Sequence, residues 1–533
     1  MNSCLKYIRY RKFGITASTS LLTAGATAHH ASIPTYAASS PSMTLHTSST
    51  SYHQATPVVS MQVPSDTTHV LDTPTEFYQA MIHHIQQATH RIVMAALYLG
   101  DDELTAKLMA AIREQLQAQP DLQVTLLCDH TRAFRTGEYS TAQQCADLVA
   151  SCPGRVNAVL WQHPFQRTLP WNKMPPRFRE GGGVMHMKAA VFDDTVLLTG
   201  ANLSHQYFAN RQDRYMLFKG AAELADYVQG AVQAVADTGV PCNDSAAAEA
   251  GSQVEAQQVA DALRTFTRSR ASGGESASAG LKPGQTRVFP LFQFGPGQLQ
   301  DDAVFTKQLL EGAPGLSSLA QQLSVATGYF NLPTEYVRSV SLTKFHAVDF
   351  LTSAPQCNGF YGARGPAGAI PQAYTEIEKH FLQRVGPNAA SALFEYARPD
   401  WTFHGKGAWL SLQRNAGLPA ELSDSTAHPV VRAGYDAAQA ADDGVYMTMI
   451  GSPNFGHRSV HRDLELQFVI LTRDAQLKRQ LEEERARLWD PQHTQQVTSA
   501  ELSTPERSIQ PASADWSRGA WVSPAWRIIQ STL

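Results

Sequence analysis

One four-part pattern occurs twice in this 533-residue chain, and it limits the possible folds more than any other feature. Each half contains an H-x-K pair, then an asparagine, then a carboxylate eleven residues after that asparagine: His186, Lys188, Asn202 and Asp213 in the first half, and His404, Lys406, Asn454 and Glu465 in the second. A single H-x-K pair could arise by chance. Two pairs with matching followers are very unlikely to, so the sequence predicts two related halves.

The segments around each pair repeat as well. "RIVMAALYLGDDELTAKL" is echoed by "LSVATGYFNLPTEYVRSV", and "LQVTLLCDH" by "FHAVDFLTSAP". Short apolar runs that alternate with amphipathic segments are typical of buried strands covered by helices. We therefore expect an α/β fold with two domains, each a parallel or mixed sheet flanked by helices. If they pack about a pseudo-twofold axis, both H-x-K pairs can meet in one cleft.

The expected organisation follows from composition and from the repeat. It places a first domain at 66–242, a linker at 243–283, a second domain at 284–490 and a tail at 491–533. The His-to-Asn interval is 16 residues in the first half and 50 in the second, so an insertion of loop composition is expected at about 412–444. The tail interleaves Trp516, Trp521 and Trp526 with arginines, a pattern that suits a membrane interface or packing on the body.

The first 65 residues contain four basic residues, many Ser and Thr, and no Asp or Glu. This composition predicts a mitochondrial transit peptide, with a secretory signal as the second interpretation. Its removal would leave 39 basic against 47 acidic residues, a formal net charge of −8. An acidic chain argues against nucleic acid as a partner. No run of 18 apolar residues is present, so any membrane contact is expected to be peripheral.

The repeated residues suit chemistry at a phosphodiester. On a strand, residues i and i+2 point to the same face, so the His and Lys of each pair are expected to project together. Lysine and asparagine donors can stabilise phosphoryl oxygens, one histidine can attack phosphorus, and the other can transfer protons. Asp213 or Glu465 could orient a histidine, or form ordinary ion pairs with nearby arginines. No cofactor or metal is expected.

At this point the chain resembles the phospholipase D superfamily, whose H-x-K-x4-D motif occurs twice and forms one active site. Asp193 completes the first motif and is interpreted as structural. The second motif has Ser411 at that position, and Gly200 stands where the superfamily often has serine.

"SPNFGHRSVHRDLE", "ANLSHQYFANRQDRY" and "NGFYGARGPAGAIPQAY" are similar to eukaryotic mitochondrial phosphatidylglycerophosphate synthases. The resemblance implies transfer of a phosphatidyl group from CDP-diacylglycerol to sn-glycerol 3-phosphate, with release of CMP, on the route to phosphatidylglycerol and cardiolipin. It implies His186 as the nucleophile of a phosphohistidine intermediate and His404 as acid and base; spacing alone leaves the two roles open. Peripheral attachment to the matrix face of the inner membrane is expected. Candidate phosphate ligands are Arg364, Arg458 and Arg462.

Three other functions remain open from the sequence. A nuclease-like phosphodiesterase would need a basic groove. A related transferase would use another alcohol, such as serine or phosphatidylglycerol. A non-enzymatic scaffold predicts loss of the H-x-K pairs, and both are intact.

Overall fold

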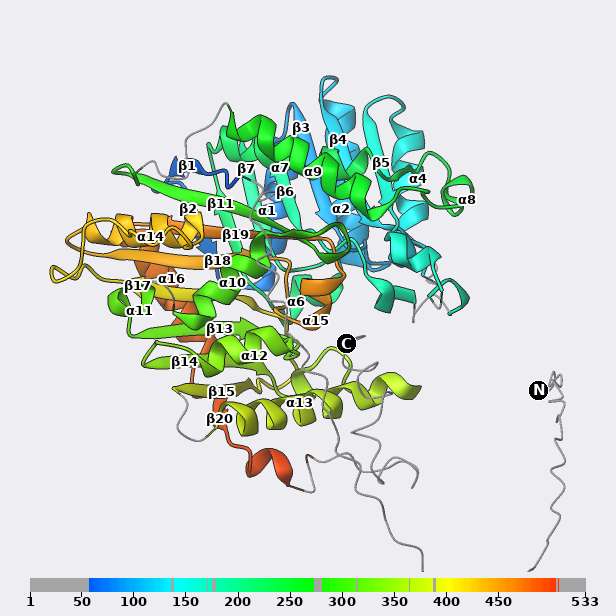
Figure 1. Ribbon diagram of the computed structural model, residues 1–533. Helices are drawn as coiled ribbons and strands as arrows, with labels where there is room; N and C mark the ends of the chain where they lie inside the picture. Colours follow the sequence, from blue (N-terminus) through cyan, green and yellow to red (C-terminus); the bar gives the residue numbers. More distant parts are fainter. Residues whose placement is uncertain are drawn as a thin grey trace, which may run out of the picture. The chain divides into compact units, whose positions relative to one another are not determined.

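The computed structural model describes residues 57–135, 139–169, 171–174, 179–272, 280–312, 315–363, 365–386, 390–504 and 507. Within these ranges the chain folds around two β-sheets flanked by helices (Figure 1). The mixed α/β class expected from the apolar periodicity is therefore confirmed.

The first sheet has eight strands in the order β10-β5-β4-β3-β6-β7-β9-β2. Their bounds are β2 Thr68–Leu71, β3 Arg91–Ala96, β4 Gln123–Asp129, β5 Val156–Trp161, β6 Ala189–Phe192, β7 Thr195–Thr199, β9 Tyr215–Phe218 and β10 Val240–Pro241. Strands β3, β4 and β5 are parallel, and all other neighbours are antiparallel.

The second sheet repeats this order strand for strand. It runs β20-β15-β14-β13-β17-β18-β19-β11, with β1 added at the β11 edge and β12 paired to β11. The bounds are β1 Met61–Pro64, β11 Gln285–Phe294, β12 Leu299–Gln300, β13 Gln322–Thr327, β14 Ala347–Ser353, β15 Ser391–Tyr396, β17 Lys406–Leu412, β18 Val445–Gly451, β19 Glu465–Thr472 and β20 Thr494–Val497. Here β13, β14 and β15 are the parallel strands. The repeat in the sequence is thus a repeat of topology.

Helices cover the sheets and start at residues suited to capping. The longer helices are α1 Pro74–Gln87, α2 Glu103–Ala118, α4 Thr141–Ser151, α7 Ala222–Ala236, α9 Ala256–Ala271, α10 Asp301–Glu311, α12 Thr334–Ser341, α13 Ile370–Val385, α14 Pro429–Gln439 and α16 Ala475–Leu488. The short ones are α3 His130–Ala133, α6 His205–Ala209, α8 Ser245–Ala248, α11 Leu316–Leu319 and α15 His457–His461. Asp102, for example, accepts a hydrogen bond from the amide of Thr105 at the start of α2.

Three apolar clusters hold the layers together. The central cluster joins the facing sides of both sheets to α7, α9 and α16, and includes Val93, Val228, Phe468 and Leu481. A second packs the outer side of the first sheet against α1, α2 and α4. A third packs the outer side of the second sheet against α10, α12, α13 and α14. Because the central cluster draws side chains from both halves, the halves share one core.

The structure differs from the expected organisation at four places. Strand β1 lies within the interval predicted to be a transit peptide, and it pairs with β11 of the second half. The expected linker contains α9, which packs in the central core. The expected insertion loop contains α14, whose apolar residues Val430, Val431 and Ala438 are buried. Part of the expected tail is β20, an edge strand paired with β15.

Two other expectations concern residues that the structure does not describe. Residues 1–56 of the predicted transit peptide lie outside the described residues, as do Trp516, Trp521 and Trp526 of the predicted membrane-interface segment. Within the described part of the chain, no helix is both long and apolar enough to cross a membrane.

Candidate active site

Each segment that carries a histidine lies against a segment of the other half. We call this arrangement the exchange. Residues 184–186 lie beside residues 463–464: the Leu464 amide donates to the Val184 carbonyl at 2.9 Å, and the His186 amide donates to the Leu464 carbonyl at 2.8 Å. In the same way β16 Thr402–Phe403, just before His404, pairs in parallel with β8 Arg211–Gln212. Each histidine segment therefore lies against the residues that precede the carboxylate of the other half.

This exchange creates two histidine–carboxylate pairs. His186 Nδ1 lies 2.8 Å from Glu465 Oε2, and His404 Nδ1 lies 2.5 Å from Asp213 Oδ2. All four side chains are buried. A carboxylate at Nδ1 favours the tautomer with its proton on that nitrogen, which leaves Nε2 as the reactive atom. Both pairs need both halves, so neither half contains a complete site.

The two lysines are buried beside the histidines, with different partners. Lys188 Nζ donates to the backbone carbonyl of His186 at 2.9 Å. Lys406 Nζ donates to the Gly200 carbonyl and to Asp213 Oδ2, both at 3.2 Å, and lies 2.7 Å from His404 Nδ1. The motif residues differ slightly from the expected geometry, because both histidines and Lys188 precede strands β6 and β17 instead of lying within them.

Burial dominates the charge states of this cluster. It lowers the pKa of Lys188 to about 7, although Glu465 opposes the shift. Burial also lowers the pKa of His186, and burial together with Lys406 lowers the pKa of His404 well below its usual range. Burial would raise the pKa of Glu465, but His186 and Lys188 outweigh it and hold that pKa below its usual value. Near pH 7 both histidines are therefore neutral.

The asparagines lie at the ends of the strands that follow the motifs. Asn202 Nδ2 donates to the Tyr207 hydroxyl at 2.9 Å. Among the described residues, the side-chain carbonyl oxygens of Asn202 and Asn454 are buried without a hydrogen-bond partner. A buried polar atom without a partner is destabilising unless a ligand or water satisfies it. Both amides thus retain binding capacity that the fold does not use.

Other predicted residues lie apart from the histidines. Asp193 occupies a turn at positive φ, and its carboxylate accepts from the amides of Thr89, His90 and Arg91 at 2.8–2.9 Å. These contacts fit the structural interpretation of Asp193, and a catalytic role for this motif residue stays an untested prediction. Ser411, at the equivalent position of the second motif, is exposed on β17. Arg364 lies outside the described residues.

Arg458 and Arg462 mainly make contacts within the protein. Arg458 pairs with Asp463 at 2.9 Å, and Asp463 also accepts from the Val184 amide. Arg462 donates to the Gly181 carbonyl and lies over the Trp171 ring at 5.2 Å. These contacts connect the second half to the loop before His186, so the phosphate-binding role expected for both arginines has no support from their contacts.

Several neighbours of the site were not predicted from the sequence. The Tyr207 hydroxyl lies 3.4 Å from His404 Nε2, and the Tyr329 ring packs edge-on against His404 with centroids 5.4 Å apart. Asp129 accepts from the Met185 amide at 2.9 Å, and burial raises the pKa of Asp129 to about 7. Tyr329 belongs to the quoted repeat segment "TGYFN", and Tyr207 follows Asn202 by five residues; these positions are the only signal in the sequence that pointed to them.

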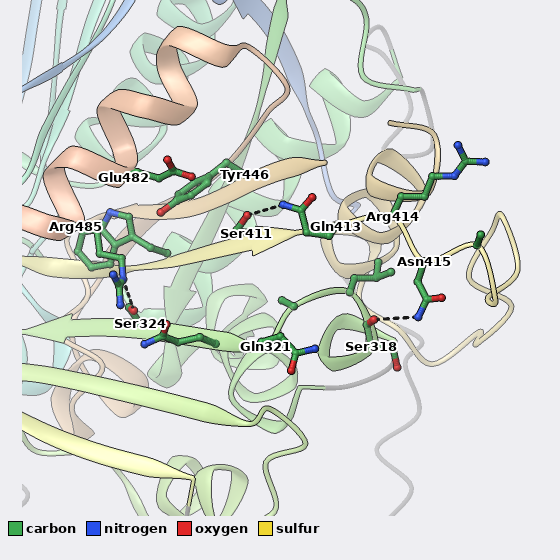
Figure 2. Close-up of a pocket in the computed structure, with 15 residues that line it drawn as sticks. Ser318, Gln321, Ser324, Ser411, Gln413, Arg414, Asn415, Tyr446, Glu482 and Arg485 are labelled. Atoms are coloured by element: carbon green, nitrogen blue, oxygen red, sulfur yellow. Dashed lines mark hydrogen bonds between the residues drawn. The ribbon is translucent and has the colours of Figure 1, made fainter. Parts of the chain in front are cut away.

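A cavity of about 710 Å³ lies elsewhere, on the second sheet (Figure 2). Its walls include Ser324, Tyr446, Glu482 and Arg485, and none of the eight repeated residues lines it. We therefore assign this cavity no role in the chemistry. Among the described residues, no group of three or more His, Cys, Asp or Glu side chains is placed to hold a metal ion.

Known proteins resemble the chain along most of its length. Residues 81–234 match the family model "Cardiolipin synthase, PLD-like domain". Mitochondrial CDP-diacylglycerol–glycerol-3-phosphate 3-phosphatidyltransferases of Mus musculus and Homo sapiens are 35% and 34% identical over 83% of this chain and 80% of their own length. The enzyme of that name from Saccharomyces cerevisiae is 30% identical over 83% of this chain and 85% of its own.

A solved structure shares the fold. The phosphatidylserine synthase of Haemophilus influenzae superimposes with a TM-score of 0.66 at 21% identity, covering 89% of this chain and 97% of that one. The repeated sheet, the exchanged histidine–carboxylate pairs and the full-length relatives agree. The chain belongs to the CDP-diacylglycerol–glycerol-3-phosphate 3-phosphatidyltransferase family, within the phospholipase D superfamily.

Proposed function

We propose that this protein transfers the phosphatidyl group of CDP-diacylglycerol to sn-glycerol 3-phosphate, giving phosphatidylglycerophosphate and CMP. The proposal rests on two buried histidines, each oriented by a carboxylate of the other half: His186 by Glu465 and His404 by Asp213. Two oriented imidazoles beside two lysines suit a two-step displacement at phosphorus. Relatives that match most of this chain carry the name of this reaction.

In the first step, His186 Nε2 attacks the phosphorus of the phosphatidyl group. A P–N bond forms, the P–O bond to CMP breaks, and the electron pair leaves with the CMP oxygen. Burial keeps His186 neutral, so its lone pair is available. Among the described residues, no protein group forms a hydrogen bond with His186 Nε2. Lys188 and Lys406 lie beside the histidines, and Asn202 reaches His404 through Tyr207; these side chains are candidate partners for the phosphoryl oxygens.

In the second step, the acceptor hydroxyl attacks the same phosphorus. Its proton moves to His404 Nε2, a P–O bond forms and the P–N bond to His186 breaks. A neutral His404 suits this role as a base, and Asp213 stabilises the imidazolium that results. Two displacements give net retention of configuration at phosphorus.

The place of action follows from relatives and composition. We propose a mitochondrial location, because relatives are named as mitochondrial and the first 65 residues have an acid-free, basic composition. The import segment would precede β1, which is part of the fold. The lipid donor implies peripheral contact with a membrane, and we propose the matrix face of the inner membrane.

The test uses the purified full chain, CDP-diacylglycerol in detergent micelles, and EDTA. CMP release is followed with and without glycerol 3-phosphate, for the wild type and for His186→Ala. Release that depends on glycerol 3-phosphate, survives EDTA and disappears in the variant is expected. Equal release without acceptor would indicate a hydrolase or another alcohol. No release under any acceptor would contradict the lipid-nucleotide donor and favour a nucleic-acid phosphodiesterase.

A further inference from the structure

Arg211 is a buried cation beside His404 to which neither the repeat nor the family motif assigns a role. It is 7% exposed, as is His186, and it is more exposed than His404 at 3%. Its guanidinium lies over the Tyr207 ring, 4.6 Å from the centroid, and the hydroxyl of that ring lies 3.4 Å from His404 Nε2. The guanidinium therefore lies about one phenol ring away from the proposed base.

The partners of Arg211 are all neutral. Nε donates to Thr402 Oγ1 at 2.9 Å, and Nη2 donates to Gln206 Oε1. Burial raises the pKa of the tyrosines around it, Tyr207 and Tyr329, so these phenols carry no charge near pH 7. Among the described residues Arg211 has no carboxylate partner.

Two other buried arginines, Arg214 and Arg264, are paired with carboxylates. Arg214, three residues later, pairs with Glu484 at 2.7 Å; Arg264 pairs with Asp261 at 3.0 Å. A buried charge without a counter-charge is strongly unfavourable. The missing negative charge at Arg211 is therefore best supplied by a ligand.

A glycine lets the chain pass close to Arg211. A Cβ on Gly359 would lie 3.0 Å from Arg211 Nη2 and 3.0 Å from the Tyr329 hydroxyl. Both distances are shorter than ordinary carbon contacts, so a side chain there would crowd the guanidinium. The segment "NGFYG", part of a stretch that is similar to the family, thus passes directly beside this cation.

We propose that Arg211 binds the phosphate dianion of the acceptor and so selects glycerol 3-phosphate over uncharged alcohols. The inference rests on the proposed function. The acceptor hydroxyl must reach His404 Nε2, and three carbons separate that hydroxyl from the phosphate. A guanidinium one ring away from Nε2 is placed at a comparable separation. Guanidinium pairs with phosphate are charge-assisted and can be bidentate.

The test compares acceptors within each variant of the full chain. kcat/KM is measured for glycerol 3-phosphate and for glycerol, in the wild type, Arg211→Gln, Arg211→Lys and Gly359→Ala. The ratio of the two values is independent of the fraction of enzyme that is folded. We expect Arg211→Gln to lower the ratio by about 10- to 100-fold, with smaller losses for Arg211→Lys and Gly359→Ala. Arg264→Gln, which removes another buried guanidinium, should lower the melting temperature and leave the ratio unchanged.

Two results would overturn the inference. An unchanged ratio in Arg211→Gln would make the residue a structural link between the halves. An equal loss for both acceptors, together with loss of the acceptor-independent CMP burst, would assign Arg211 to the diphosphate of the donor. In both cases the wild type still transfers, so the proposed function stands. A wild type without CMP release would remove both.

Discussion

The two histidines occupy equivalent positions in the repeat, but their surroundings differ. His186 has one partner, Glu465, at Nδ1, and Lys188 turns to a backbone carbonyl. His404 has Asp213 and Lys406 at Nδ1 and the Tyr207 hydroxyl near Nε2. Among the described residues, the Nε2 atom of His186 therefore has no hydrogen-bond partner, whereas His404 belongs to a hydrogen-bonded network.

This difference indicates how the two histidines can divide nucleophilic attack and proton transfer between them. An open, neutral nitrogen suits a nucleophile, and a ring linked to a carboxylate, a lysine and a phenol suits proton transfer. The CMP phosphate has a second pKa of about 6, so it can leave without being protonated. The lowered pKa of His404 is then no obstacle, because this histidine is needed mainly as a base in the second step.

The largest expected effect tests the comparison of the two histidines directly. His186→Ala and His404→Ala should each reduce turnover by about 10⁴-fold or more. Only His404→Ala should still release about one equivalent of CMP per enzyme in a rapid burst and retain labelled phosphatidyl group on the protein. Quenched-flow measurement with labelled donor checks this. A burst in His186→Ala and none in His404→Ala would reverse the roles.

The carboxylates should show the same asymmetry at a smaller scale. Asp213→Asn removes the partner of both His404 and Lys406, whereas Glu465→Gln removes mainly that of His186. We expect kcat to fall about 10³- to 10⁴-fold for Asp213→Asn and about 10²-fold for Glu465→Gln. Steady-state kinetics and thermal melts measure both effects. A larger loss in Glu465→Gln would show that the network around His404 is not the more demanding one.

Gly200 and Ser452 extend the comparison to a pair of equivalent backbone positions. A Cβ at Gly200 would lie 2.6 Å from Lys406 Nζ and 2.8 Å from Asp213 Oδ1, so Gly200→Ser should destabilise the fold by about 1–3 kcal/mol. Ser452→Gly loses the hydrogen bond from the Leu466 amide to Ser452 Oγ, at about 1 kcal/mol. Chemical denaturation compares them. Equal stability of Gly200→Ser and the wild type would mean that Lys406 moves freely.

Much of this site could be predicted from the sequence, because the repeat is local. The two copies of the pattern predict the α/β class, and they identify the histidines, lysines and carboxylates of the site. The exchange could not be predicted, because it depends on how residues 184–186 and 463–464 pair across the halves. A serine at Gly200, as the superfamily often has, would crowd Lys406, which is far away in sequence.

The boundaries of the elements were less predictable, since composition does not show burial. The segment "LQRNAGLPAELSDSTAHPVVRAGYDAAQAADDG" reads as a loop, but apolar side chains of its second half lie on α14 and pack in the core. Strand β1 resembles in composition the segment predicted to be a transit peptide, and only its pairing with β11 places it in the fold. Arg211 was considered only as an ion-pair partner of Asp213, because nothing local shows that its neighbours are neutral.

The smallest expected effect is a pH dependence that separates the lysines. Burial lowers the pKa of Lys188 to about 7; burial also lowers the pKa of Lys406, but Asp213 at 3.2 Å opposes that shift. If the Lys188 ammonium stabilises phosphoryl oxygens, it acts below about pH 7 and is lost as the pH rises through that value. His186 must be neutral, and its pKa is lowered, so its limb lies below 6.5. The kcat/KM for the donor, which reports the free enzyme, should then fall by up to about tenfold per pH unit above 7. A flat profile from pH 7 to 9 would mean that Lys188 acts only by its position, and that the ammonium of Lys406 alone faces the phosphoryl group.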